Sequence, residues 1–288
     1  MARATCVIAI AAAVVSFAAA VRAESAPVKP GTLVEVSFSA AVEKGPNVED
    51  DPSLAELLPI SAGRQSKTGA KFTAARWDFL LADGKAMLHP RSGWTTFTLS
   101  SKKPKQFCFR VYVPEGAAKI AVVGQTLGKD EKVRVEGLRV EERTPGDVLN
   151  PNPDFSATGD ELASWQLAGA ARYLKDGEGR RYAFAEDGAV FGDMFPVTGG
   201  RKLEVKFTGA PPKYATRQHI PWVAVHFYDE YSDALRPNQQ FARPRLELRS
   251  QWGREATKSH VYDIPDGAKW CRLVVRCGSA TLCEARMK

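Results

Sequence analysis

The fold is decided by Tyr262-Asp263-Ile264-Pro265-Asp266-Gly267-Ala268-Lys269-Trp270-Cys271-Arg272-Leu273-Val274-Val275, a stretch that the chain contains twice. Its earlier copy is Val111-Tyr112-Val113-Pro114-Glu115-Gly116-Ala117-Ala118-Lys119-Ile120-Ala121-Val122-Val123. In both copies an extended run reaches a Pro-acid-Gly-Ala turn, and a second extended run follows at once. This is the pattern of two β-strands joined by a short corner. The sequence therefore predicts a tandem of related β-units.

Other segments repeat in the same order and differ only in loop length. Residues 202–208 match 32–39, 223–235 match 77–88, Trp252 matches Trp94, 264–268 match 113–117, and 282–287 match 135–140. The second copy also has an opening section, residues 150–198, that the first copy lacks. One copy is therefore complete and the other is truncated at its front.

Turn signals recur roughly every 8 to 12 residues and helical periods are few, which is typical of β-sandwiches and jelly rolls. We predict an all-β protein with a truncated sandwich at 27–144 and a complete one at 145–288. Between strands of the first unit, residues 51–58 are expected to form one helical turn or two. What completes the truncated unit is left open. Because an unpaired sheet edge promotes aggregation, we expect the two units to pack together.

Residues 1–23 have the features of a signal peptide: Arg3, an Ala- and Val-rich run, and a small-x-small motif ending at Ala23. Cleavage is expected after Ala23, with Ala20 as the alternative, followed by a polar leader at 24–30. No later stretch approaches the roughly 20 apolar residues that a membrane span needs. The sequence thus predicts an exported protein, either periplasmic or extracellular.

The whole chain has a net charge of +7, which falls to near +5 once Arg3 and Arg22 are removed with the signal peptide. Acidic and basic residues alternate along predicted strands instead of forming the basic stripe of a nucleic-acid-binding protein. The short basic run at 102–105 is interpreted as a solvated loop. Nucleic acid is therefore not an expected partner, whereas weak attraction to acidic polysaccharide is compatible with the charge.

Four cysteines follow the signal peptide, and an oxidising compartment permits disulfides between them. Cys277 and Cys283 flank a short Gly-Ser-Ala-Thr segment and could clip a final hairpin. Cys271 takes the place of Ile120 in the repeat, which favours a core position. Metal binding by the thiols is not expected, because the chain has no Cys-x-x-Cys and no nearby His.

The second unit contains a distinctive set of residues in a fixed order: Asn152-Pro153-Asp154-Phe155, Trp165, the run 223–229, Trp252 and the Pro-Asp-Gly-Ala corner. With these residues it resembles the carbohydrate-binding modules appended to bacterial glycoside hydrolases. The resemblance covers about residues 148–287, and more faintly 31–142. It implies a galactose-binding-like β-sandwich.

In that family a calcium ion often ties the opening segment to the last strand. Asp154 and Glu284 are the nearest acidic residues here, but Ser156 stands directly after Phe155, where a carboxylate is expected. A structural calcium ion and a pair of solvated carboxylates both remain open.

A sugar site needs an aromatic face for the C–H side of the ring and polar groups for its hydroxyls. Trp165 is expected in the core, and the ring shared by Trp252 and Trp94 suits packing as well as binding. The candidate carbohydrate-binding residues are Trp222, Tyr228, Tyr231, Trp252, Asn238 and Arg243, with Gln239, Phe241 and Arg245 interleaved.

Catalysis finds little support in the sequence. Asp229 and Glu230 are adjacent, so on a strand they point to opposite sides and cannot flank one glycosidic bond. No nucleophile has an identifiable base, and the histidines are isolated. The leading hypothesis is a non-catalytic protein that binds polysaccharide or oligosaccharide. The alternatives are a structural or interaction module for another envelope protein, and a divergent glycoside hydrolase.

Overall fold

The computed structural model describes residues 23–44, 74–87, 96–98, 103–125, 132–155, 165–168, 171–175, 181–210, 220–229, 245–248 and 254–288. Within these ranges the regular secondary structure is entirely β, as predicted. A helix with the length and apolarity needed to cross a bilayer does not occur in them. The expected signal peptide, up to residue 22, and the helical turn at 51–58 lie outside the described residues.

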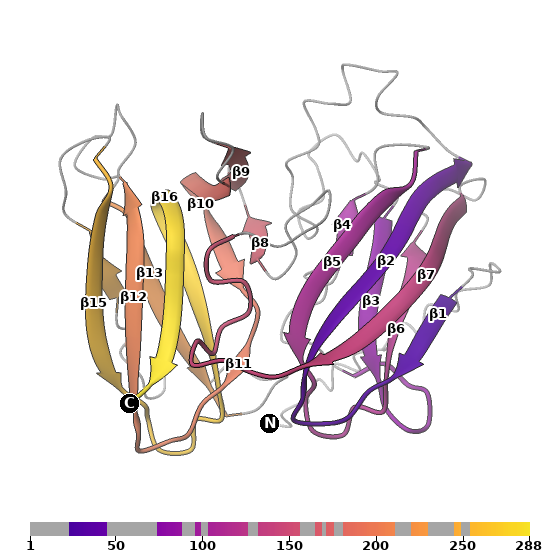
Figure 1. Ribbon diagram of the computed structural model, residues 1–288, viewed down its shortest axis with the longest axis horizontal. Coiled ribbons are helices and arrows are strands. Elements are labelled where there is room, and N and C mark those ends of the chain that lie inside the picture. The colour runs from indigo at the N-terminus through magenta and orange to yellow at the C-terminus, as the bar shows by residue number, and fades with distance from the viewer. Residues whose placement is uncertain are drawn as a thin grey trace, which may run out of the picture.

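The first unit is a sandwich of two sheets (Figure 1). One sheet has the order β1-β6-β3-β4 and the other β5-β2-β7. Alternate residues of β2, such as Val34, Val36 and Phe38, point into the core between them, and the residues that separate them, Glu35 and Ser37, are polar. The strands are β1 (Ala23–Pro27), β2 (Leu33–Lys44), β3 (Ala74–Leu80), β4 (Thr96–Thr98), β5 (Lys105–Tyr112), β6 (Lys119–Gln125) and β7 (Lys132–Arg143).

The second unit is also built of two layers, but one strand belongs to both. The first half of β16 pairs with β13 and its second half with β12, while β10 pairs with its middle part, from Val274 to Ala280. The strand changes layer at Cys277 and Gly278, whose φ angles are 58° and 150°. The strands are β8 (Trp165–Ala168), β9 (Ala171–Lys175), β10 (Arg181–Gly192), β11 (Phe195–Pro196), β12 (Lys202–Ala210), β13 (Trp222–Tyr228), β14 (Arg245–Glu247), β15 (Ala256–Asp263) and β16 (Trp270–Met287).

The duplicated corner has the same geometry in both units. Ala117 N–H donates to Pro114 O at 3.3 Å, and Ala268 N–H donates to Pro265 O at 3.1 Å. Gly116 and Gly267 both have a φ of 84°, a left-handed conformation that glycine adopts without strain. Around the corners, β5-β2-β7 corresponds to β15-β12-β16, and β6-β3 corresponds to β16-β13. The predicted internal repeat is therefore confirmed in the topology.

The expectation of a polar leader at 24–30 is wrong, because β1 occupies most of it. This strand pairs with β6, and Glu24 Oε2 accepts a hydrogen bond from Leu138 N–H at 2.6 Å. Pro27 stands opposite Lys119 just as Pro196 stands opposite Trp270, so β1 takes the place of β11. The repeat thus begins several residues earlier than predicted, and β1 supplies a strand that the truncated unit needs.

One predicted correspondence is out of register by two residues. Phe79 lies opposite Ile120 and Phe227 lies opposite Cys271, the matching residue of the second copy. Trp77 therefore corresponds to Val225 and not to Val223. A shift of two keeps every side chain on the same face of its sheet, so the hydrophobic pattern alone could not detect it.

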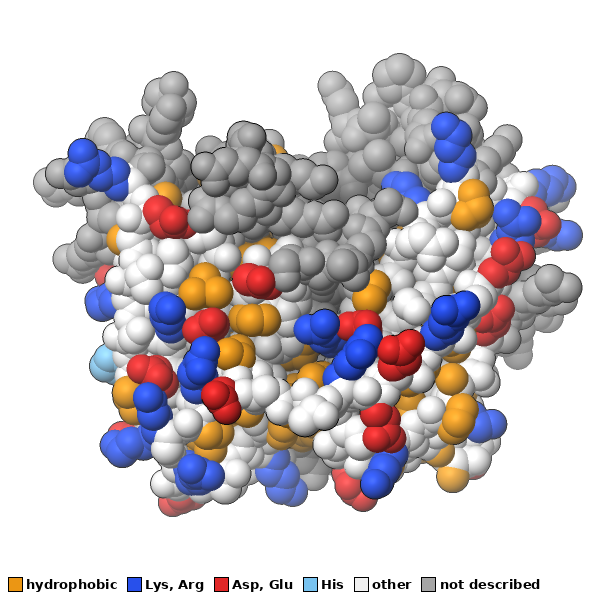
Figure 2. All heavy atoms as spheres, in the orientation of Figure 1, with side chains coloured by type: hydrophobic (Ala, Val, Ile, Leu, Met, Phe, Trp, Pro, Cys, Tyr) orange, Lys and Arg blue, Asp and Glu red, His pale blue; other side chains and the backbone are white. Residues whose placement is uncertain are grey.

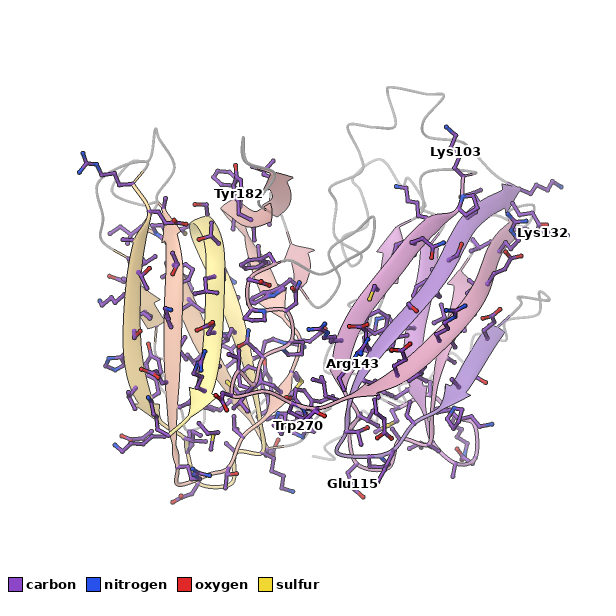
Figure 3. All side chains as sticks on the ribbon, in the orientation of Figure 1. Lys103, Glu115, Lys132, Arg143, Tyr182 and Trp270 are labelled. Carbon is purple, nitrogen blue, oxygen red and sulfur yellow. The ribbon has the colours of Figure 1, made fainter. Side chains whose placement is uncertain are left out.

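The two units share hydrophobic contacts, as expected. Leu33 and Tyr112 of the first unit belong to the main core cluster of the second, and Met194 and Tyr228 of the second belong to that of the first. Trp270 packs against both clusters and lies where the two units meet (Figure 3). Burial raises the pKa of Tyr112 to about 12, so this interface residue stays neutral.

The disulfide that Cys277 and Cys283 could have formed is not present, and both residues are thiols. The hairpin that it would have closed does not exist, because both lie on the continuous strand β16. Six extended residues span roughly 20 Å, whereas a disulfide brings its Cα atoms to within about 7 Å. Cys271 is fully buried in the core, as its match to Ile120 predicted.

We expect a thiol reagent to distinguish two classes of cysteine in the folded protein. Burial raises the pKa of Cys271 and of Cys283, and neither side chain is exposed, so both should resist modification. Cys108 and Cys277 are half-buried and should react first. Mass spectrometry after short labelling would show this order. Equal labelling of all four without denaturant would contradict the core positions.

Candidate functional site

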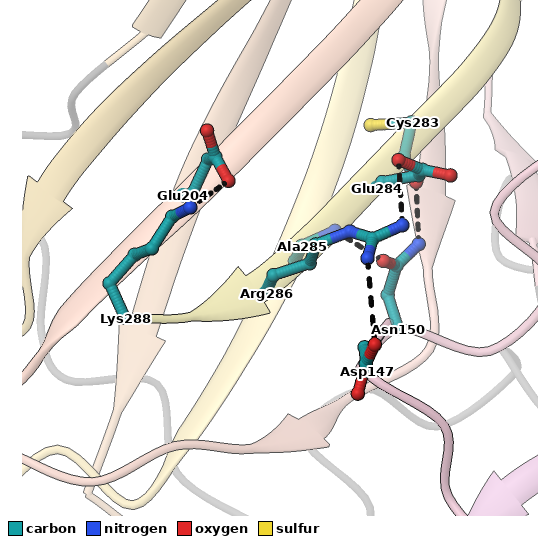
Figure 4. Close-up of polar contacts among 8 residues, drawn as sticks. All are labelled: Asp147, Asn150, Glu204, Cys283, Glu284, Ala285, Arg286 and Lys288. Atoms are coloured by element: carbon teal, nitrogen blue, oxygen red, sulfur yellow. Dashed lines mark hydrogen bonds and ion pairs between the residues drawn. The ribbon is translucent and has the colours of Figure 1, made fainter.

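The opening segment of the second unit is tied to the last strand by the side chain of Asn150 (Figure 4). Its amide nitrogen donates to Cys283 O, and its amide oxygen accepts from Ala285 N–H, both at 2.7 Å. The buried amide thus pairs with the backbone as a neighbouring strand would. The connection that the family resemblance assigns to calcium is made here by an uncharged side chain.

The acidic residues considered for that ion are not gathered into a site. Glu284 lies 3.5 Å from Arg286, and Asp154 is exposed. Throughout the described segments, no group of three or more His, Cys, Asp or Glu side chains could hold a metal ion.

The outer face of the layer formed by β15, β12 and the second half of β16 is covered with paired charges. Lys288 and Glu204 lie 2.8 Å apart, and Lys202 and Asp263 lie 3.0 Å apart. Basic and acidic side chains alternate across this face (Figure 2). Exposed pairs of this kind contribute little to stability.

The outer face of the other layer is different, because apolar residues cover it around Trp222. Ala224 and Val274 are buried there, on the side of the sheet that faces away from the core. Trp222 is half-buried and packs against them. We call this surface the Trp222 face; it consists of Trp222, Ala224, Arg245, Glu247, Val274, Arg276, Ala189 and Phe191.

Two arginines hold the Trp222 ring from the two neighbouring strands. Arg276 lies directly opposite Trp222 on β16, and its Cζ is 5.7 Å from the ring centroid. Arg245 on β14 places its Cζ 5.8 Å from the same ring. Arg245 Nε also lies 2.9 Å from Glu247 Oε1. Both cations are within the distance at which an indole face attracts a guanidinium group.

Tyr228 is on the same face of β13 as Trp222 but does not belong to the exposed surface. Its side chain is 4% exposed and packs in the core cluster of the first unit. Arg272 Cζ lies 5.9 Å from its ring. The prediction that Tyr228 stacks against a sugar is therefore wrong, because the neighbouring unit covers the ring.

The other predicted binding residues, Tyr231, Trp252, Asn238 and Arg243, lie outside the described residues. Trp165 is in the core as expected: it is 2% exposed, and its Nε1–H donates to Asn152 O at 2.7 Å. The sequence reasoning missed Arg276. Alternation along 272–276 places Arg272, Val274 and Arg276 on one side of a strand, but the pairing of that strand with β13 was not predicted.

No family model matches the chain, and no curated protein matches it significantly. Among solved structures it is similar to the tandem CBM22-1–CBM22-2 domain of Xyn10C from Paenibacillus barcinonensis, with 9% identity, 92% of this chain and 82% of that chain covered, and a TM-score of 0.33. The K1 cleaved adhesin domain of Lys-gingipain from Porphyromonas gingivalis W83 follows at 15% identity, 43% and 82% coverage, and a TM-score of 0.28. The ectodomain of ANX1 from Arabidopsis thaliana has 8% identity, 92% and 81% coverage, and a TM-score of 0.23. Scores this low carry no argument about function.

Proposed function

We propose that the protein is an exported, non-catalytic carbohydrate-binding protein whose Trp222 face holds polysaccharide or oligosaccharide. The observation that carries the proposal is the half-buried Trp222 on an apolar sheet surface, held between Arg245 and Arg276. An indole of this kind offers a flat apolar face to the C–H side of a pyranose ring. The adjacent guanidinium groups supply donors for the hydroxyls.

The rigidity of the surface supports binding. Trp222 is carried by the middle of three paired strands, β14-β13-β16, and rests on buried side chains. Because the ring is already fixed, a sugar would not have to immobilise it, which lowers the entropy cost of association.

Replacing Trp222 with alanine should weaken glycan binding by about tenfold or more, the usual cost of removing an aromatic hot spot. Affinity electrophoresis against a panel of polysaccharides, followed by isothermal titration with the best ligand, measures this effect. His260→Ala is the matched control, because His260 is an exposed ring on β15, which pairs in the other layer. Absence of binding to any glycan at millimolar concentration would refute the proposal.

A further inference from the structure

We propose that the ligand of the Trp222 face is an acidic polysaccharide, and that Arg276 binds its carboxylate groups. This inference rests on the proposed function and specifies the class of glycan. Its basis is the arrangement of charges around Trp222.

Positive charge dominates the outer face of β14, β13 and the first half of β16. Arg245, Arg272 and Arg276 point to this side. Among the described side chains of these three strands, Glu247 is the one acidic residue on the same side. Arg272 is 5% exposed and lies over Tyr228, at the end nearest the first unit. Arg245 and Arg276 are exposed and flank Trp222.

The hydrogen-bonding edge of a stacked guanidinium group stays available to a ligand. Such a group contacts an aromatic ring through its flat face, whereas its five N–H donors lie in its plane and point outward. Arg276 Cζ lies 5.7 Å from the Trp222 ring centroid, and among the described residues this arginine makes no ion pair, whereas Arg245 Nε already pairs with Glu247. A fixed fork of this geometry matches a carboxylate, which accepts two parallel hydrogen bonds from one arginine.

Arg276 is the stronger anchor of the two. Arg245 shares its charge with Glu247, at an Nε–Oε1 distance of 2.9 Å. Among the described residues, Arg276 makes no ion pair and interacts with the Trp222 ring. An unneutralised cation beside an aromatic platform is complementary to the carboxylate of a uronic acid.

Arg110 and Arg143 of the first unit show the contrast. In the first unit Glu35 lies 2.8 Å from Arg110 and 2.6 Å from Arg143. Burial alone would raise the pKa of Glu35, but the hydrogen bonds from Arg143 and Arg110 outweigh it and lower the pKa. There the carboxylate that neutralises the arginines comes from the protein itself. At Arg276 we infer that it comes from the ligand.

The experiment compares two polysaccharides with one backbone. Polygalacturonate carries a carboxylate on each residue, and its methyl ester is the same chain without the charge. We expect the folded full-length protein to bind polygalacturonate at least about tenfold more tightly than the ester, the contribution of roughly one charge-assisted hydrogen-bonded pair. The preference for polygalacturonate over its ester should fall as the salt concentration is raised. Binding of neither polymer, nor of any neutral glycan, would refute the proposed function itself. Equal binding of both polymers would overturn this inference and leave the proposed function standing.

Two substitutions test whether the preference comes from Arg276. Arg276→Gln should remove most of the difference between the two polymers, and Arg276→Lys should restore only part of it, because lysine keeps the charge without the planar fork. The control is Arg139→Gln, which removes an exposed positive charge from the first unit. Dextran sulfate reports on charge alone. If Arg139→Gln reduced binding as much as Arg276→Gln, or if dextran sulfate bound as tightly as polygalacturonate, diffuse attraction would explain the result and the inference would be wrong.

Discussion

Replacing Asn150 with alanine should lower the free energy of unfolding by about 2 to 4 kcal/mol, since a buried backbone group left without its partner costs roughly 1 to 3 kcal/mol. The amide of Asn150 makes two buried hydrogen bonds, to Cys283 O and Ala285 N–H, each 2.7 Å long. Alanine leaves both backbone groups without this partner. Urea unfolding followed by fluorescence measures the loss.

Two further variants separate the hydrogen bonds from other effects. Asn150→Asp keeps an acceptor for Ala285 N–H but presents an oxygen to Cys283 O, so it should also destabilise. Asp147→Asn changes an exposed carboxylate whose distance to Arg286 is 4.0 Å, and it should have little effect. A wild-type stability for Asn150→Ala would show that the opening segment is held by other contacts.

Replacing Tyr228 with alanine should destabilise the protein by about 3 kcal/mol, the lower end of the range for removing a large buried ring. The ring is 4% exposed and belongs to the core cluster of the first unit, although Tyr228 belongs to the second. Its removal should loosen the contact between the units. Calorimetry should then show a lower midpoint and a broader transition, because the two units no longer unfold together.

The binding behaviour of Tyr228 variants distinguishes a packing role from a ligand role. Tyr228→Phe keeps the ring and should retain most of the stability. At temperatures below its unfolding midpoint, the Tyr228→Ala variant should bind glycan with the affinity of the wild type. The Trp222→Ala variant should keep the stability of the wild type but bind glycan weakly. If the folded Tyr228→Ala variant lost glycan binding, Tyr228 would belong to the binding site.

Most of the fold is predictable because local chemistry determines it. The Pro-acid-Gly-Ala corner requires a left-handed glycine, and Gly116 and Gly267 adopt it. The alternation of Val34, Val36 and Phe38 determines which side of β2 is buried. β1 was missed because its five residues carry no such alternation, so only its pairing with β6 reveals it. A Pro-Val-x-x-Gly match between 27–31 and 196–200 was the available signal.

The candidate site is less predictable because it depends on contacts between distant segments. Trp222 and Tyr228 lie on the same side of one strand, and their spacing alone does not show which of the two rings is exposed. The first unit covers Tyr228, whereas Trp222 lies between arginines from β14 and β16. The role of Arg276 depends on the register of β13 against β16, which is set by long-range pairing.

The central claim is that Trp222 is the aromatic platform, and its indole N–H signal tests this most directly. The chain has six tryptophans, so ¹⁵N-tryptophan labelling gives a spectrum that single Trp→Phe variants can assign. Titration with an oligogalacturonate should shift the Trp222 signal and leave that of Trp165 unchanged, because the Trp165 Nε1–H is bonded internally to Asn152 O. A spectrum in which Trp252 or Trp94 shifts while Trp222 does not would contradict the assignment of the binding surface.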